Sequence, residues 1–285
     1  MFEGWYAKVK NFEDILWIIK GYEHPENGYI AIPYLIGKKK ISSNDFIKYT
    51  PRNFIKYLDC VGRDVPVILK ESIIESYDPH EIFINKYMNL PQKILELIDV
   101  INPSYVGLIG SYAFGLENIN SDVDLTVFGD NRKIYEKLKE LRNNGLIKNC
   151  SNRYNKVSNT MSQKAYLMLS NRRVLDSCYL NIPYTIRILR QIESKKCYSM
   201  YSNISSYKGL IEIYDNDESY LVPSFYKVKS IDYGNIELVT WHTRYSELPL
   251  GKYYFDGTLQ RDEIKHKIII SPDLGGKIEP IEIWP

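Results

Sequence analysis

The chain has 285 residues, 44% of them hydrophobic, and a net charge of +2, which predicts a folded globular protein of two or three domains. No apolar run approaches the ~20 residues of a spanning helix, and the start lacks a signal-peptide pattern. We therefore expect a soluble, cytoplasmic protein without a membrane partner. The four cysteines have no C-x-x-C spacing, which argues against a zinc site or a disulfide framework and favours buried free thiols: Cys60, Cys150, Cys178 and Cys197.

Residues 1–88 predict a small α+β domain. Two strand-like runs flank the turn-forming residues 24–28, His-Pro-Glu-Asn-Gly, which indicates a β-hairpin. Residues 45–49 and 52–60 have helical character, and residues 64–69 favour a strand. His24, as a turn histidine beside a proline, is expected at the surface.

A second domain is expected over residues 89–198. Residues 91–101 predict a helix that starts at Pro91 and is apolar on one face, and the apolar residues 106–109 predict a strand. That strand runs into Gly110-Ser111. Glycine lets a backbone N–H come close to a phosphate, and serine adds a hydroxyl donor at a helix N-terminus.

Asp122 and Asp124 begin a second predicted strand, residues 122–128. Side chains two apart on a strand project from the same side. Two neighbouring carboxylates stay ionised when a cation lies between them, and Mg²⁺ combines carboxylate oxygens with substrate phosphates. Together with Gly110 and Ser111, the pair predicts a site for phosphate and metal.

Gly110-Ser111, the spacer, and the run Ser121-Asp122-Val123-Asp124-Leu125 resemble the signature of the DNA polymerase beta type nucleotidyltransferase superfamily. The resemblance covers residues 89–198. It implies an α/β (α+β) palm-like core with a mixed sheet, in which Asp122 and Asp124 hold two Mg²⁺ (or Mn²⁺) ions. It further implies that Gly110 and Ser111 bind the β- and γ-phosphates of a nucleoside triphosphate such as ATP.

The resemblance also implies a third carboxylate on a neighbouring strand. The sequence predicts a helix that Asp130 caps and that ends at Gly145, and a second helix at residues 161–169. Two strands are expected after these helices, at residues 173–179 and 184–189. Asp176 is the acidic residue available on the first of them, as metal ligand and proton acceptor. An alternative alignment uses the second strand and replaces the acid by Arg187, which would place catalysis in doubt.

Positive charge gathers in the same region. Residues 89–198 carry 16 basic and 10 acidic side chains, a local charge of +6, which suits a nucleotide or nucleic-acid enzyme. Four arginines near the last two strands are candidates for phosphate contacts: Arg172, Arg173, Arg187 and Arg190.

Residues 199–285 alternate apolar and polar positions between turn signals, which predicts an all-β barrel-like domain or a sandwich, with a last edge strand after residue 276. Exposed aromatics could stack on bases, but the local charge of −4 opposes backbone binding. We therefore expect core roles for most of the candidates: Tyr226, Trp241, Tyr245, Tyr253 and Tyr254.

The sequence thus predicts a metal-dependent nucleotidyltransferase that moves a nucleoside monophosphate to an acceptor hydroxyl and releases pyrophosphate. The sequence does not identify the acceptor, for which RNA, a protein and a small molecule are the candidates. It does not identify the preferred base either. The alternative is a catalytically degenerate module of the same fold that binds RNA or a partner protein.

Overall fold

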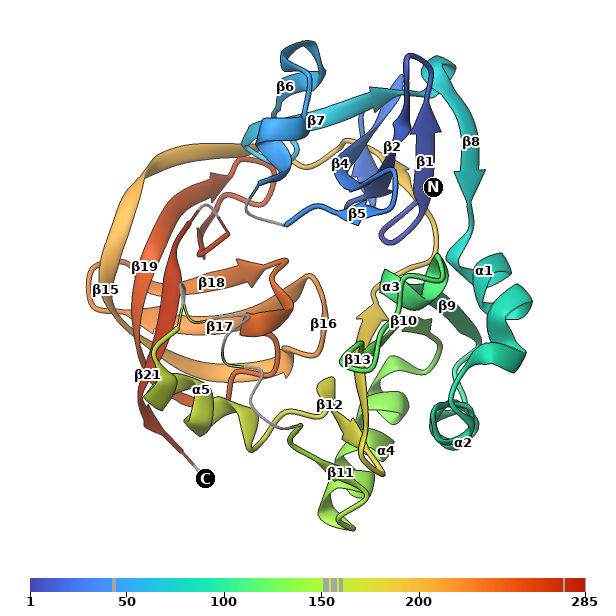
Figure 1. Cartoon of the computed structure of the whole chain (residues 1–285). Coiled ribbons are helices and arrows are strands. Elements are labelled where there is room, and N and C mark those ends of the chain that lie inside the picture. The colour runs from blue at the N-terminus through green and yellow to red at the C-terminus, as the bar shows by residue number, and fades with distance from the viewer. Residues whose placement is uncertain (43–44, 151–153, 155–157, 159–160, 274, 285) are drawn as a thin grey trace. The chain divides into compact units, whose positions relative to one another are not determined.

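The computed structural model describes residues 1–42, 45–150, 154, 158, 161–273 and 275–284 (Figure 1). The chain is a mixed α+β protein in which strands predominate. Its residues group into two compact units, each assembled from separate stretches of sequence. Unit 1 consists of Met1–Leu90, Tyr105–Thr126 and Gln191–Tyr201. Unit 2 consists of Pro91–Ser104, Val127–Arg190 and Ser202–Pro285.

Unit 1 is built on an antiparallel sheet with the strand order β6-β7-β4-β2-β1-β8, to which the short β5 adds by pairing with β4. The strands are β1 (Tyr6–Val9), β2 (Phe12–Ile19), β4 (Gly28–Ile36), β5 (Lys39–Lys40), β6 (Ile55–Leu58), β7 (Arg63–Leu69) and β8 (Ile73–Tyr77). The pairing of β2 with β4 confirms the predicted hairpin. One face is covered by a buried apolar cluster: Ala7, Val9, Ile15, Trp17, Ile19, Ala31 and Ile68.

Two predictions for this region are wrong. Residues 52–60 form a single 3-10 turn, η2 (Arg52–Phe54), followed by β6, because pairing with β7 from Ile55 to Leu58 supplies the backbone hydrogen bonds that a helix would otherwise make. His24 is buried, at 3% exposure, because β3 (Glu23–His24) pairs with β14 (Lys195–Lys196) instead of forming the tip of a turn. Further short 3-10 turns with described bounds are η1 (Phe46–Tyr49), η3 (Lys70–Ser72), η4 (Tyr87–Asn89) and η6 (Thr243–Tyr245).

The segment that carries the sequence motif follows the sheet in unit 1. Helix α1 (Pro79–Lys86) leads to β9 (Tyr105–Ile109), the one-turn helix α3 (Gly110–Ala113) and β10 (Val123–Phe128), whose last two residues belong to unit 2. The predicted strand, turn and strand are therefore confirmed. His80 of α1 binds this segment, since its Nδ1 lies 2.7 Å from the Val106 carbonyl oxygen and its ring stacks on Tyr105.

Unit 2 contains the longer helices, α2 (Gln92–Ile101), α4 (Asn131–Asn143) and α5 (Gln163–Ser170). The predicted apolar face of α2 is buried, and Pro91 is its N-cap. Asp130 caps α4 as predicted, because its carboxylate accepts the Lys133 N–H at 3.2 Å. In the mixed sheet of this unit, β11 (Ile147–Lys148), β12 (Asp176–Tyr179) and β13 (Ile182–Leu189) are antiparallel, and β16 (Leu221–Val222) pairs with β13 in parallel.

The C-terminal strands form a near-closed ring of five, shown in orange and red in Figure 1. The order is β15-β17-β18-β20-β19, with an additional β15–β19 pairing, and β21 extends from β19 at the edge as expected. The strands are β15 (Tyr201–Glu218), β17 (Ser224–Ser230), β18 (Gly234–Thr240), β19 (Gly251–Asp262), β20 (Lys267–Ser271) and β21 (Lys277–Ile283). The ring core contains three of the five aromatic candidates, Tyr226, Tyr245 and Tyr253, which confirms their structural role.

All four cysteines form disulfides, so the prediction of free thiols is wrong. Cys60 pairs with Cys197 in unit 1, and Cys150 pairs with Cys178 in unit 2, with Cα–Cα distances of 5.5 and 5.2 Å. The partners are 137 and 28 residues apart, and spacing along the sequence does not reveal which cysteines the fold brings together. None of the helices in the described part of the chain is long and apolar enough to cross a membrane.

Candidate functional site

The end of β9 positions Gly110. All five residues of β9 are buried, and the chain turns into α3 at Gly110, where φ is +77°. A residue with a side chain is strained at this angle, whereas glycine adopts it freely. The Gly110 N–H donates to Tyr6 Oη at 3.0 Å in a buried hydrogen bond, so the turn is fixed to β1.

The same glycine lies directly against Asp124. A Cβ atom on Gly110 would be 2.1 Å from Asp124 Oδ2 and 2.8 Å from Asp124 Cβ. Both distances are far below a van der Waals contact. The glycine therefore leaves the space that the carboxylate side chain occupies, and the structure brings these two predicted site residues together.

The aspartates lie on the accessible side of β10. Val123 and Leu125 are buried at 1% and 0% exposure, whereas the intervening Asp124 and the preceding Asp122 are partly exposed. This alternation confirms that the two aspartates do not share the buried face. Asp122 directly precedes the first residue of the strand. The pKa of Tyr112 is raised, mainly by burial of its hydroxyl, and the negative charges of Glu117 and Asp122 add to the rise.

The loop from α3 to β10 is held by its own hydrogen bonds. The Ser111 carbonyl accepts the Phe114 and Leu116 N–H groups, and Asn118 N–H donates to Ser121 Oγ at 2.9 Å. Ser111 itself is partly exposed at the first turn of α3. The spacer between the two halves of the motif is thus an ordered connection.

The N-terminal sheet supports the motif through an aromatic contact. The rings of Tyr6 and Phe114 meet edge to face at 4.8 Å, and Ile109 and Leu116 pack in the same cluster. Tyr6 is completely buried. Sequence reasoning did not assign it a role, because it is 104 residues from Gly110 and no local pattern marks such a contact.

Asp176, the candidate third carboxylate, is the first residue of β12 in unit 2. Its Oδ2 lies 3.8 Å from Arg173 Nη1, and its Cα partner on β13 is Thr185. Directly opposed residues on antiparallel strands share a face, and so do residues two apart on one strand. Asp176, Thr185 and Arg187 therefore project from the same face of this hairpin, so both candidates for the third position lie on it.

A buried carboxylate fixes the approach to β12. Glu247, at 7% exposure, accepts the N–H groups of Val174 at 2.9 Å and Leu175 at 3.1 Å, and its Oε2 lies 3.8 Å from Arg173 Nε. Burial raises the pKa of the Glu247 carboxyl, while the Arg173 charge opposes the rise. Two main-chain donors and a guanidinium compensate a charge that would otherwise be costly to bury. We call Glu247 and Arg173 the buried clamp.

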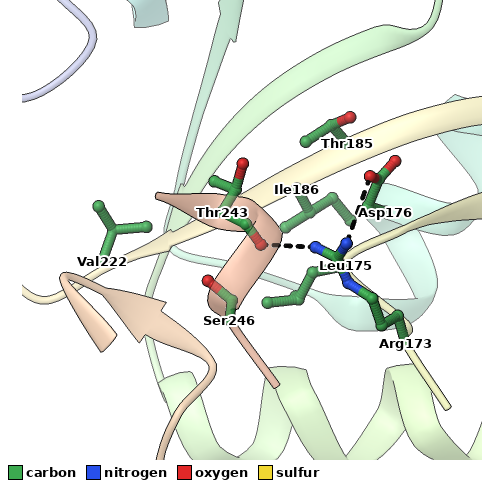
Figure 2. A pocket seen from close by; sticks show the side chains of 8 residues that line it. All are labelled: Arg173, Leu175, Asp176, Thr185, Ile186, Val222, Thr243 and Ser246. Atoms are coloured by element: carbon green, nitrogen blue, oxygen red, sulfur yellow. Dashed lines mark hydrogen bonds and ion pairs between the residues drawn. The ribbon is translucent and has the colours of Figure 1, made fainter. Parts of the chain in front are cut away.

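Figure 2 shows the surroundings of Asp176. Arg173 extends between Asp176 and the Thr243 carbonyl, to which its Nη2 donates at 2.6 Å. The lining residues enclose a cavity of about 10 Å³, which is close to the size required by one water molecule. A nucleotide does not fit into it.

Three of the four predicted arginine candidates, Arg172, Arg173 and Arg190, bind protein groups. Arg172 Nη1 donates to the Trp284 carbonyl at 3.1 Å. Arg190 lies 2.8 Å from Glu218 and over the ring of Phe225. These contacts make structural use of side chains that the sequence suggested for phosphates.

The carboxylates of Asp122 and Asp124 are the kind of ligand that a hard divalent cation prefers. Mg²⁺ is commonly bound by one or two carboxylates and completes its shell with waters and substrate phosphates. Asp122 and Asp124 can supply the carboxylates. Over the described residues, no group of three His, Cys, Asp or Glu side chains gathers as a metal site.

In comparisons with known proteins, no family model, no curated protein and no solved structure matches the chain.

Proposed function

We propose that this chain is a metal-dependent nucleotidyltransferase that transfers a nucleoside monophosphate from a nucleoside triphosphate to an acceptor hydroxyl and releases pyrophosphate. The observation that carries the proposal is the contact of Gly110 with Asp124, in which a side-chain-free turn lies against a carboxylate of an acidic pair. This is the arrangement that a triphosphate and its cations require: a turn with a hydroxyl on one side and oxygen ligands on the other.

Each motif residue has a role in this reaction. Asp122 and Asp124 would hold the cations. The hydroxyl of the partly exposed Ser111 would donate a hydrogen bond to the β- and γ-phosphates. Gly110, whose N–H is bonded to Tyr6, would serve the same reaction by leaving room for the Asp124 carboxylate beside the turn. Bound Mg²⁺ lowers the pKa of the attacking hydroxyl and neutralises charge on the leaving group. The part of Asp176 as third metal ligand and proton acceptor remains a prediction from the sequence.

The finer architecture belongs to the same proposal. Strand β9, α3 and β10 would form part of a palm-like core within residues 89–198. Residues 1–88 would form the N-terminal α+β domain that supports it through Tyr6, and residues 199–285 would form a barrel-like domain from the five-strand ring.

The test uses purified protein, α-labelled triphosphates, Mg²⁺ or Mn²⁺, and RNA, protein and small-molecule acceptors. We expect label transfer that falls by at least about 10²-fold in Asp122→Ala and Asp124→Ala. Asp99→Asn, at an exposed position on α2, is the control and keeps full activity. If no triphosphate is bound or transferred by the native protein under these conditions, the proposal fails.

The second candidate is a degenerate module of this fold that binds RNA or a protein without catalysis. It is favoured by the arginines around Asp176, because Arg173 is ion-paired with it and Arg187 shares its face. Asp176→Asn separates the two functions. An enzyme loses transfer in this variant and keeps triphosphate binding, whereas a binding module shows no transfer before or after the change.

A further inference from the structure

Unit 1 contains a second concave site, at the turn between β1 and β2. A pocket of about 220 Å³ is formed there by this turn, η2, the start of β6 and the end of β7 with η3. Its lining residues are Val9, Lys10, Asn11, Phe12, Asn53, Phe54, Lys56, Leu69 and Ser72. None of them belongs to the sequence motif, so the pocket is a site in addition to the one described above.

Two of the residues that line this pocket are aromatic, Phe12 and Phe54. The rings of Phe12 and Phe54 meet at 5.2 Å, and Phe54 in turn contacts the buried Trp17 at 5.4 Å. Both phenylalanines are only partly buried. Phe12 and Phe54 meet edge to face, at an interplanar angle of 72°, so one of the two rings at a time can offer its face to a planar heterocycle. Such a stacking contact is worth about 1–3 kcal/mol for each base.

The exposed residues that line the pocket are cationic or carry amides. Lys10, Lys56, Asn11 and Asn53 are all exposed. Lysines attract phosphate as point charges, and an asparagine amide pairs with the donor and acceptor edge of a base. Glu13 is the acid attached to this turn, and its carboxylate accepts the Asn11 N–H at 2.9 Å.

The walls of the pocket are fixed by backbone hydrogen bonds. Lys10 N–H donates to the Ser72 carbonyl at 2.8 Å, and Phe54 N–H donates to the Pro51 carbonyl at 2.9 Å. Ser72 Oγ donates to the Leu69 carbonyl at 2.7 Å. The site is therefore formed before a ligand arrives, which lowers the entropic cost of binding.

From this combination we propose that the pocket binds one nucleotide unit, with the base against Phe12 and Phe54 and the phosphate between Lys10 and Lys56. At about 220 Å³ the pocket is smaller than the about 300–1,000 Å³ of typical small-molecule sites, so it takes no more than part of one nucleotide unit and excludes a duplex. The unit is either a free nucleoside monophosphate or one nucleotide of a single strand.

Binding is measured with EDTA present, so that the proposed metal-dependent reaction plays no part. The probes are nucleoside monophosphates, followed by calorimetry, and short labelled RNA and DNA single strands, followed by fluorescence anisotropy. We expect the double variant Lys10→Glu with Lys56→Glu to weaken binding by about tenfold or more. For a single strand, two phosphate contacts should give a slope of about −1.4 when the logarithm of the binding constant is plotted against the logarithm of the salt concentration. The double variant should lose this slope. Binding of monophosphates and strands indicates a free-nucleotide site, and binding of strands alone indicates a nucleic-acid site; either supports the proposal.

The matched control is Lys38→Glu with Lys39→Glu. It makes the same change in net charge on exposed lysines of unit 1 that do not line the pocket, and we expect less than about a twofold effect. Phe54→Leu keeps the apolar volume but removes the ring, and should weaken binding by about fivefold or more. The proposal is overturned if no probe binds, or if the control weakens binding as much as the pocket variant.

Discussion

At the residue scale, the candidate site depends on one missing side chain. Gly110 faces both Oδ2 and Cβ of Asp124, so rotation of the aspartate cannot relieve a clash with an added methyl group. Gly115, in the same loop, also has a positive φ, of +65°, but has nothing within 4 Å of its Cβ position. The two glycines thus separate the effect of backbone strain from the effect of steric contact.

We predict that Gly110→Ala costs about 1–3 kcal/mol more free energy of unfolding than Gly115→Ala, because only the former overpacks the site. Both variants carry the cost of a positive φ. Urea unfolding measures the difference. Equal losses in the two variants would show that Asp124 does not lie against Gly110 in solution.

His24 makes the stability of unit 1 sensitive to acid. Burial, followed by the positive charge of the N-terminal amine, lowers its pKa from 6.5 to about 4, and its Nδ1 accepts the Ile30 N–H at 3.2 Å. Glu3 raises the pKa and Lys70 lowers it, and both effects are smaller than that of burial. Because the folded pKa lies below the unfolded one, the unfolded state binds the proton first.

We therefore predict that the stability supplied by neutral His24 is complete above pH 6.5 and is lost as the pH falls to about 4, by about 3 kcal/mol. His24→Asn keeps an acceptor for the Ile30 N–H and has no charge to gain. Unfolding curves over this pH range should be flatter by that amount in the variant. If native protein and variant have the same pH dependence, the histidine is not buried as described.

At the scale of elements, the buried clamp joins the loop after β18 to the start of β12. Glu247→Gln turns an amide N–H₂ group toward main-chain donors and leaves the Arg173 guanidinium without its charge partner. We expect a loss of about 3–5 kcal/mol, which is typical when one partner of a buried pair is removed. Glu282→Gln removes an exposed ion pair with Lys252 and should cost less than about 1 kcal/mol. A loss of that small size in Glu247→Gln would contradict the clamp.

Elements with strong local signals were predictable from sequence. The apolar stripe of α2, the Asp130 cap of α4 and the alternation at Asp122 to Leu125 are set by neighbours in the chain, and the structure has them where expected. Residues 52–60 were not predictable, because β6 exists through its pairing with β7. Tyr6 and Glu247 were missed for the same reason, since their partners lie far away in the sequence.

At the scale of the whole molecule, the two disulfides close loops of very different length. Loop entropy predicts that the longer closure stabilises more. In oxidised protein, replacing Cys60 and Cys197 by serine should cost about 1 kcal/mol more than replacing Cys150 and Cys178, given separations of 137 and 28 residues. Denaturant unfolding without reductant measures the difference. Thiol titration of the unfolded, unreduced protein should find no free thiol, and four thiols would refute both disulfides.

The stretch Gln191–Tyr201 returns to unit 1 between two stretches of unit 2. Its β14 supplies the partner of β3, its Cys197 bonds to Cys60, and Glu23 accepts hydrogen bonds from Tyr198 and Ser199. Domains usually fold in order of synthesis, the N-terminal one first. Here a ribosome must reach residue 201 before the first domain to emerge can be finished. If translation stalls before residue 195, β3, which contains His24, has no β14 to pair with, and unit 1 cannot complete its fold.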